Sequence, residues 1–324
     1  MKRILSIVMV LAVVLACFAA CGGNGDNSGA KAMTMGTGGT SGTYYGYGGT
    51  LGNQIKKSTG ISVNVVSTDG SKANILGIDT GNYQLATVQS DVMAYAWNGS
   101  RTFEAEGKLE SFRVIGGLYA EAVQLVTMDA EIKSVADLKG KKVSIGAAGS
   151  GVYFNAMDIL AAAGLSEDDI VPQYQSFADS ADALKDGKID AAFIVAGAPT
   201  PAIQELCTST SAYLVPVDGD VAEKLMKDSP YYTTYKIPAG TYNGQDADVT
   251  TVTVKATLIV SASASEEDVY NITKAIFDNV EAISSSHAKG AELSLENATD
   301  GMTAPFHAGA AKYFAEKNIT VESK

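Results

Sequence analysis

The sequence is poor in the residue types that build disulfide-bonded, zinc-binding and nucleic-acid-binding proteins. Only three cysteines occur in 324 residues, and two of them, Cys17 and Cys21, lie at the N-terminus, so Cys207 has no disulfide partner in the body of the chain. The two histidines, His287 and His307, have no zinc-ligand spacing around them. There are 24 basic against 36 acidic residues, and a formal net charge of −12 disfavours nucleic-acid binding.

Long apolar runs are also absent after the N-terminal segment, which itself has the order of a secretory signal. Lys2-Arg3 supply positive charge, an apolar run covers residues 4–16, and small residues close the segment at Phe18-Ala19-Ala20. The apolar run is shorter than the roughly 20 residues that a transmembrane helix needs. We therefore predict an exported protein with a signal peptide at residues 1–20.

Cys21 is the predicted lipid-attachment site. The residues before it resemble a lipobox with Phe18 in place of the usual leucine, and the glycine-rich residues 21–31 are expected to form a flexible tether. Cys17 is an alternative attachment site, and an ordinary cleavage site in a soluble exported protein is another alternative. The preferred prediction places the protein on the outer face of the cell membrane, anchored by lipid.

Short β-rich runs alternate with helical patterns along the rest of the chain. A strand at residues 32–35 is followed by a helix at 44–58 and a strand at 61–66, and the pattern restarts with a strand at 142–145 and a helix at 152–163. This alternation is typical of βαβ units and a parallel sheet. We expect an α/β fold with two Rossmann-like lobes.

A long β-branched run at residues 249–260 predicts a strand that crosses between the lobes. We expect it to pair with the apolar run 124–128 and to precede an amphipathic helix over residues 266–284. Two crossing strands would form a hinge about which the lobes close on a ligand. The predicted boundaries place residues 32–126 and 251–324 in lobe I and residues 127–250 in lobe II.

Two glycine-rich loops, at residues 36–45 and 146–153, each follow a predicted strand and lead into a predicted helix. Glycine lets backbone N–H groups approach an anion, and the dipole of a helix N-terminus attracts it. Ligands of open α/β sheets collect at the carboxyl ends of the strands. The two loops are therefore expected to meet at one small-molecule site, the alternative being tight turns that serve only packing.

The side chains in these loops suit a carboxylate ligand. The hydroxyl groups of Thr40 and Ser150 can donate to it, while Tyr44 and Tyr45 can cover its carbon skeleton. Neither loop contains lysine or arginine, so backbone N–H and hydroxyl groups would hold the anion.

Two acidic residues near the expected site each have two interpretations. Asp91 follows Ser90 at the start of a predicted helix, where it would either cap the helix or face the ligand. Glu121 would either contact an ammonium group of an amino acid or make a hydrogen bond at the hinge. The pair does not indicate acid–base catalysis.

Several short motifs follow one another in a characteristic order. They are the glycine-tyrosine loop, Val88-Gln89-Ser90-Asp91-Val92, Gly117-Leu118-Tyr119-Ala120-Glu121-Ala122-Val123-Gln124-Leu125-Val126, Asp137-Leu138-Lys139-Gly140, Gly149-Ser150-Gly151 and Gly197-Ala198-Pro199. In this combination the chain resembles the TAXI branch of TRAP-transporter solute receptors over residues 33–319. Ala120 stands where relatives commonly have proline, which removes local rigidity but no ligand group.

The resemblance implies a type II periplasmic-binding-protein fold, in which a two-strand hinge joins the lobes, and no cofactor. The implied function is capture of a small organic anion, a glutamate-like amino acid or a dicarboxylate, and its delivery to a TRAP-type membrane permease. The implied ligand-binding residues, at matching positions only, are Gly38, Gly39, Thr40, Tyr44, Tyr45, Gln89, Asp91, Tyr119, Glu121, Gly149, Ser150, Ala198, Pro199, Thr241 and Tyr242.

Two other classes of function compete with a transport receptor. Gly36-x-Gly38-x-x-x-Gly42 is a loosened dinucleotide fingerprint, and no Gly-x-x-x-x-Gly-Lys-Ser/Thr loop occurs, so a nucleotide-dependent enzyme is disfavoured. Ser150 lacks the Gly-x-Ser-x-Gly frame of a hydrolase nucleophile. An exported ligand-sensing subunit of a signalling system, built on the same fold, is the remaining alternative.

Overall fold

The computed structural model describes residues 31–324. The predicted signal peptide, Cys17, Cys21 and nearly all of the tether lie outside the described residues. Within residues 31–324, no helix is long and apolar enough to cross a membrane.

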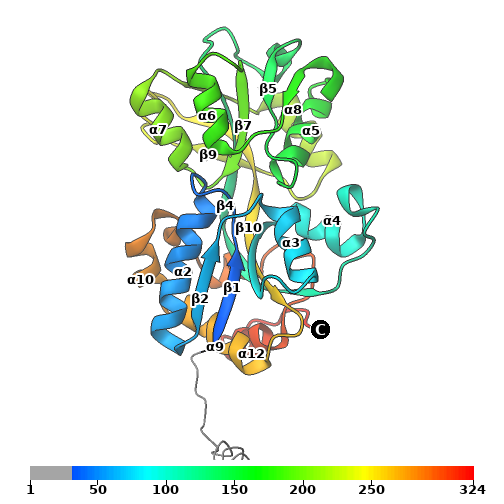
Figure 1. The fold of residues 1–324 in the computed structure, drawn as a ribbon, viewed down its shortest axis with the longest axis vertical. Helices are drawn as coiled ribbons and strands as arrows, with labels where there is room; N and C mark the ends of the chain where they lie inside the picture. Colours follow the sequence, from blue (N-terminus) through cyan, green and yellow to red (C-terminus); the bar gives the residue numbers. More distant parts are fainter. Residues whose placement is uncertain (1–30) are drawn as a thin grey trace, which may run out of the picture. The chain divides into compact units, whose positions relative to one another are not determined.

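The strands of the described part form one mixed sheet that passes through both lobes (Figure 1). They are β1 (Ala32–Gly36), β2 (Ser62–Val66), β3 (Leu85–Gln89), β4 (Phe112–Thr127), β5 (Lys142–Ser144), β6 (Val171–Gln173), β7 (Ala191–Ala196), β8 (Tyr213–Val215), β9 (Thr233–Ile237) and β10 (Val249–Ser261). Their spatial order is β2-β1-β3-β10-β4-β7-β5-β6, with β8 beside β4 and β9 beside β10. Strands β1, β2 and β3 pair in parallel in lobe I, as do β5, β6 and β7 in lobe II.

Helices connect the parallel strands, so each lobe has the expected βαβ architecture. The α-helices are α2 (Thr43–Thr59), α3 (Ser71–Asp79), α4 (Ser90–Asn98), α5 (Val152–Ala162), α6 (Phe177–Lys185), α7 (Pro201–Ser209), α8 (Gly219–Asp228), α9 (Glu266–Phe277), α10 (Val280–Ser286), α11 (Leu295–Thr299) and α12 (Ala308–Glu316). The short 3-10 helices are η1 (Arg101–Phe103), η2 (Val135–Leu138), η3 (Glu167–Asp169) and η4 (Ala288–Glu292).

Strands β4 and β10 carry the chain between the lobes (Figure 1). The expected pairing of β10 with residues 124–128 is wrong, because β10 pairs with residues 112–122 of β4, and residues 124–127 pair with β7. Residues 112–127, including Gly116 and Gly117, form one continuous strand. A β-carbon at Gly117 would lie 2.7 Å from the carbonyl oxygen of Asn297, so glycine here permits close packing rather than a turn.

The helix expected over residues 266–284 is divided into α9 and α10. Asn279 leaves the helical conformation, with φ −125° and ψ 31°. Its Nδ2 donates to the carbonyl oxygen of Ala275 at 2.9 Å and so competes with the backbone for a helix-terminal acceptor.

The hydrophobic core divides at the middle of the two crossing strands. In β4, Tyr119 packs into the core of lobe I and Val123 into that of lobe II. In β10, Ala256 packs into the core of lobe I and Val254 into that of lobe II. The α/β class with two lobes joined by two crossing strands is therefore confirmed. The lobe boundaries at residues 126/127 and 250/251 stay a prediction.

Candidate functional site

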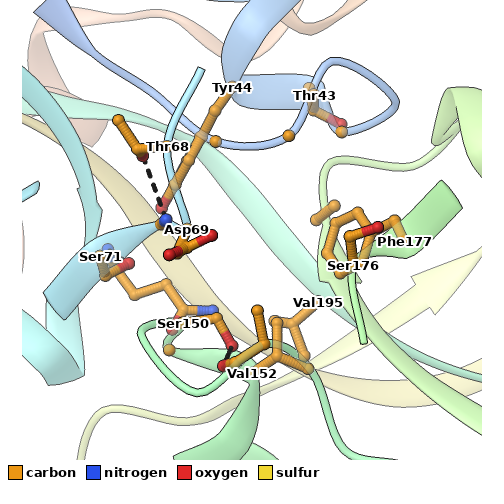
Figure 2. Close-up of a pocket in the computed structure, with 18 of the residues that line it drawn as sticks. Thr43, Tyr44, Thr68, Asp69, Ser71, Ser150, Val152, Ser176, Phe177 and Val195 are labelled. Atoms are coloured by element: carbon orange, nitrogen blue, oxygen red, sulfur yellow. Dashed lines mark hydrogen bonds between the residues drawn. The ribbon is translucent and has the colours of Figure 1, made fainter. Parts of the chain in front are cut away.

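Four helices begin at the cleft between the lobes, each just after the carboxyl end of a parallel strand. Thr43, Ser71, Val152 and Phe177 are the first residues of α2, α3, α5 and α6, and all four line one cavity (Figure 2). The first turn of a helix has N–H groups without intrahelical partners and carries partial positive charge. The backbone of both lobes therefore directs positive charge at this cavity.

The cavity has a volume of about 90 Å³, which holds several water-sized groups. Figure 2 shows Tyr44 extending from the start of α2 toward Asp69 and Ser71, with Ser176 and Phe177 on another side of the cavity. The lining residues are Gly38, Gly39, Gly42, Thr43, Tyr44, Thr68, Asp69, Gly70, Ser71, Gln89, Glu121, Ala147, Ser150, Gly151, Val152, Gln175, Ser176, Phe177, Val195 and Ala196.

The cavity wall contains a buried acid and, among the described residues, no lysine, arginine or histidine. Glu121 on β4 is 2% exposed, and its Oε2 accepts a hydrogen bond from the hydroxyl group of Tyr44 at 2.9 Å. Burial, together with the nearby carboxylate of Asp91, holds the pKa of Glu121 well above its ordinary value. A cationic partner would restore the charged form of this carboxyl group.

Two lining amide groups also present acceptors. The Oε1 atoms of Gln89 and Gln175 are buried without a donor among residues 31–324. A buried acceptor without a donor costs about 1–3 kcal/mol, so a ligand that donates hydrogen bonds would remove this cost. The cavity therefore combines backbone donors with side-chain acceptors.

Hydrogen bonds cross between the lobes beside the cavity. Thr43 Oγ1 of lobe I donates to the carbonyl oxygen of Gly197 in lobe II at 2.8 Å, and the N–H of Ala202 in lobe II donates to the carbonyl oxygen of Ser41 at 3.1 Å. The lobes are therefore in a closed arrangement in this structure.

Two glycines of lobe II permit this close approach. A β-carbon on Gly151 would lie 1.5 Å from Oε1 of Gln89. A β-carbon on Gly197 would lie 2.9 Å from Cε of Lys289 and 3.0 Å from Cγ2 of Thr43. Both glycines are thus required for contact with lobe I and not by the conformation of their own backbone, which lacks a positive φ.

The structure places the residues predicted for the site in two groups. Those that line the cavity are Gly38, Gly39, Tyr44, Gln89, Glu121 and Ser150. Those that do not line it are Thr40, Tyr45, Asp91, Tyr119, Gly149, Ala198, Pro199, Thr241 and Tyr242.

Local geometry explains why three of the predicted tyrosines do not line the cavity. Tyr45 is rotated by about 100° from Tyr44 around the axis of α2. Tyr119 is fully buried in lobe I, where its ring packs edge-on against Tyr47 at a centroid distance of 5.0 Å. The hydroxyl group of Tyr242 is satisfied inside lobe II, by the N–H of Thr200 at 2.8 Å and by Gln124.

Three lining segments were missed in the sequence. Val195 and Ala196 are the last residues of β7, whereas residues 68–71 join β2 to α3 and residues 175–177 join β6 to α6. The two joining segments each link a strand end to a helix start, as the glycine-rich loops do, and Ser176 caps α6 by accepting from the N–H of Asp179 at 3.2 Å. The strand-to-helix order, rather than glycine content, was the signal that identifies them.

Asp91 lies behind the cavity wall. It is the second residue of α4, whose N-cap position is Gln89, so the expectation that Asp91 caps the helix is wrong. Its Oδ2 accepts from Nδ2 of Asn155, in lobe II, at 2.9 Å, and its side chain is fully buried. Burial raises the pKa of Asp91 to about 7, and the charge of Asp158 adds to the effect.

Replacing Asp91 with asparagine is expected to flatten the pH dependence of stability. Because the pKa of Asp91 is about 7 in the folded protein against an ordinary value near 4, the folded state retains a proton that the unfolded chain releases between these pH values. The stabilisation is complete below about pH 4 and is lost as pH rises through 7. At pH 8, Asp91→Asn should increase the free energy of unfolding by on the order of 4 kcal/mol.

Urea unfolding of both proteins at pH 5 and pH 8 measures this difference. The introduced amide keeps an oxygen that can accept from Asn155, so the packing is unchanged. An equal loss of stability from pH 5 to pH 8 in both proteins would show that Asp91 does not titrate in this range.

Comparison with known proteins gives the same architecture. Residues 35–317 match the profile of the NMT1-like family. PhnD1 from Prochlorococcus marinus (MIT 9301), solved with methylphosphonate, superposes with a TM-score of 0.53 at 11% identity, over 80% of this chain and 89% of that chain. A protein from Bordetella bronchiseptica RB50 superposes with a TM-score of 0.53 at 18% identity, over 88% of each chain. A putative L-cystine ABC transporter protein from Listeria monocytogenes superposes with a TM-score of 0.50 at 18% identity, over 82% of this chain and 98% of that chain.

At these identities the structural similarity concerns the fold. The type II periplasmic-binding-protein fold expected from the sequence is confirmed. The family match covers most of the chain, from β1 through α12. The chain therefore belongs to the NMT1-like family.

Proposed function

We propose that the protein is an exported solute receptor, not an enzyme, and that it binds a small amino acid in the closed cleft. The observation that carries the proposal is the division of polarity within one cavity: four helix N-termini supply donors, and Glu121 with Gln89 supplies acceptors. The family, and the fold shared with a putative L-cystine ABC transporter protein and with PhnD1 in complex with methylphosphonate, support a receptor.

The helix N-termini favour a carboxylate as one end of the ligand. An anion at such a terminus gains about 0.3–1 kcal/mol from the dipole of one helix, in addition to its hydrogen bonds with free N–H groups. The helices come from both lobes, two from each, so the carboxylate would draw the lobes together.

Glu121 favours an ammonium group as the other end. A dicarboxylate would bring a second negative charge to a buried acid without a cationic side chain in the cavity wall. An ammonium group would instead pair with Glu121 and donate to the free Oε1 of Gln89. The geometry thus favours an amino acid over a dicarboxylate.

The delivery step of the proposal follows the resemblance in the sequence. The closed receptor would carry its ligand to a TRAP-type permease and remain near the membrane through lipid on Cys21. A sensing role for the same receptor would use the same cleft.

A thermal-shift screen of paired ligands tests the proposal. L-Glutamate, L-glutamine and L-alanine would be compared with glutarate and propionate, which lack the amino group, and with ATP and NAD. At about 100 times its Kd, a ligand of the native state stabilises it by about 2.7 kcal/mol. We expect a higher Tm with at least one amino acid and little change with its desamino partner.

Each contrary outcome rejects a defined part of the proposal. Equal shifts with L-glutamate and glutarate would contradict recognition of the ammonium group. A shift with ATP or NAD alone would contradict the receptor function.

A further inference from the structure

A chain of hydrogen bonds links the cavity to the interface between the lobes, with Asn155 at its centre. Asn155 lies on α5 of lobe II and is fully buried. Its Oδ1 accepts from Nε2 of Gln89 at 3.0 Å, and its Nδ2 donates to Oδ2 of Asp91 at 2.9 Å and to the hydroxyl group of Tyr232 at 2.7 Å. One amide of lobe II thereby holds two residues of lobe I.

This network of hydrogen bonds continues from Tyr232 to an ion pair between the lobes. The hydroxyl group of Tyr232 donates to Oδ2 of Asp158 at 3.2 Å, and the other carboxylate oxygen of Asp158 contacts Arg101 of lobe I. The guanidinium group of Arg101 also lies 5.2 Å from the centre of the Tyr95 ring. The polar path therefore crosses the interface twice, at Asn155 and at Asp158.

Hydrogen-bond complementarity fixes the orientation of the amide groups along the path. In its charged form, above about pH 7, the Asp91 carboxylate only accepts, so Asn155 must present its NH₂ group to Oδ2, and Oδ1 of Asn155 then faces Gln89. Gln89 must present its own NH₂ group to that oxygen. Its Oε1 is thereby left as a buried acceptor with no donor among the described residues, and it lies beside Gly151, which lines the cavity.

We infer that Asn155 and Asp91 are positioning residues, which hold the Gln89 amide so that its oxygen receives an N–H donor of the ligand. The inference rests on the proposed function and adds to it the origin of the preference for an amino group. Asn155 reaches Gln89 and Asp91 only when lobe II lies against lobe I. The preference is therefore established by closure of the lobes.

Asp91→Asn is the sharpest substitution, because it conserves volume and removes the constraint on orientation. The introduced amide can both donate and accept, so the amides of Asn155 and Gln89 can turn over together and present an NH₂ group to the cavity. We expect the ratio of the glutarate Kd to the L-glutamate Kd to fall by about 10-fold, the size of one hydrogen bond to a charged group.

A double-mutant cycle with Gln89→Met shows whether Asp91 acts through Gln89. If it does, Asp91→Asn has little further effect on this ratio in the Gln89→Met background. If the two substitutions act independently, the ratio of the glutarate Kd to the L-glutamate Kd falls by about 100-fold in the double variant. That result would show that Asp91 acts on the ligand without Gln89, and it would overturn the inference. Titration calorimetry with glutarate and L-glutamate gives this ratio for wild type, the two single variants and the double variant.

Hydrogen exchange tests the coupling to closure without any ligand. Asn155→Leu should increase amide exchange in the first turns of α4 and α5, on both sides of the interface. Tyr153→Phe is the matched control on the same helix, since the Tyr153 hydroxyl group donates to Glu167 within lobe II. Faster exchange confined to lobe II in Asn155→Leu would overturn the coupling. Failure of wild type to bind L-glutamate would overturn the proposed ligand, while the exchange result would still decide the coupling.

Discussion

Replacing Gly151 with alanine is expected to weaken L-glutamate binding by about 100-fold while both lobes remain folded. The new β-carbon would lie 1.5 Å from Oε1 of Gln89 and 3.0 Å from Cγ2 of Val92, so the lobes must separate or Gln89 must leave its position. Either change removes contacts that the closed site requires. Gly151 itself has φ −72° and ψ −21°, a conformation that alanine adopts readily.

Titration calorimetry measures the loss of affinity, and Gly49→Ala is the matched control. No atom lies within 4 Å of a β-carbon at Gly49, which is inside α2. Alanine there should leave the affinity unchanged and stabilise the protein by about 0.5–1 kcal/mol. Wild-type affinity in Gly151→Ala would show that the closed contact between Gly151 and Gln89 is not part of the ligand-bound state.

Replacing Glu121 with glutamine is expected to reduce the affinity for L-glutamate by about 100-fold and to leave that for glutarate unchanged or higher. Loss of one partner of a buried charge pair costs about 2–5 kcal/mol. The variant retains an oxygen that accepts from the Tyr44 hydroxyl group, so the shape of the cavity is preserved. The opposite responses of the two ligands separate a charge effect from general damage.

Glu110→Gln is the control for this substitution, because Glu110 is an exposed carboxylate of lobe I that pairs with Lys324 at 3.1 Å. Glu110→Gln should leave the affinities for L-glutamate and for glutarate unchanged. Equal weakening of both ligands in Glu121→Gln would mean that Glu121 supports the hinge and does not contact an ammonium group.

Local sequence patterns were sufficient to determine the fold class and two walls of the site. Alternation of β-branched and helical segments depends on neighbouring residues, and so do the glycine-rich turns before α2 and α5. Because carboxyl ends of parallel strands converge in any such fold, Gly38, Tyr44 and Ser150 could be assigned to one cavity before the structure was known.

Tertiary structure alone decided which polar groups face the cavity and which lie behind it. Gln89 and Asp91 are two residues apart, and both bond to Asn155 from a segment more than 60 residues away, yet only Gln89 lines the cavity. The close approach of Gly117 in β4 to the carbonyl oxygen of Asn297 likewise joins segments that are far apart in the sequence.

The sequence by itself thus determined the lobes, their parallel strands and the loops at the strand ends, since these follow from periodicity and turn chemistry within a few residues. The burial of Asp91, the free oxygen of Gln89 and the contact of Gly151 with lobe I required the tertiary structure. Each depends on groups that become neighbours only when distant segments pack and the lobes close.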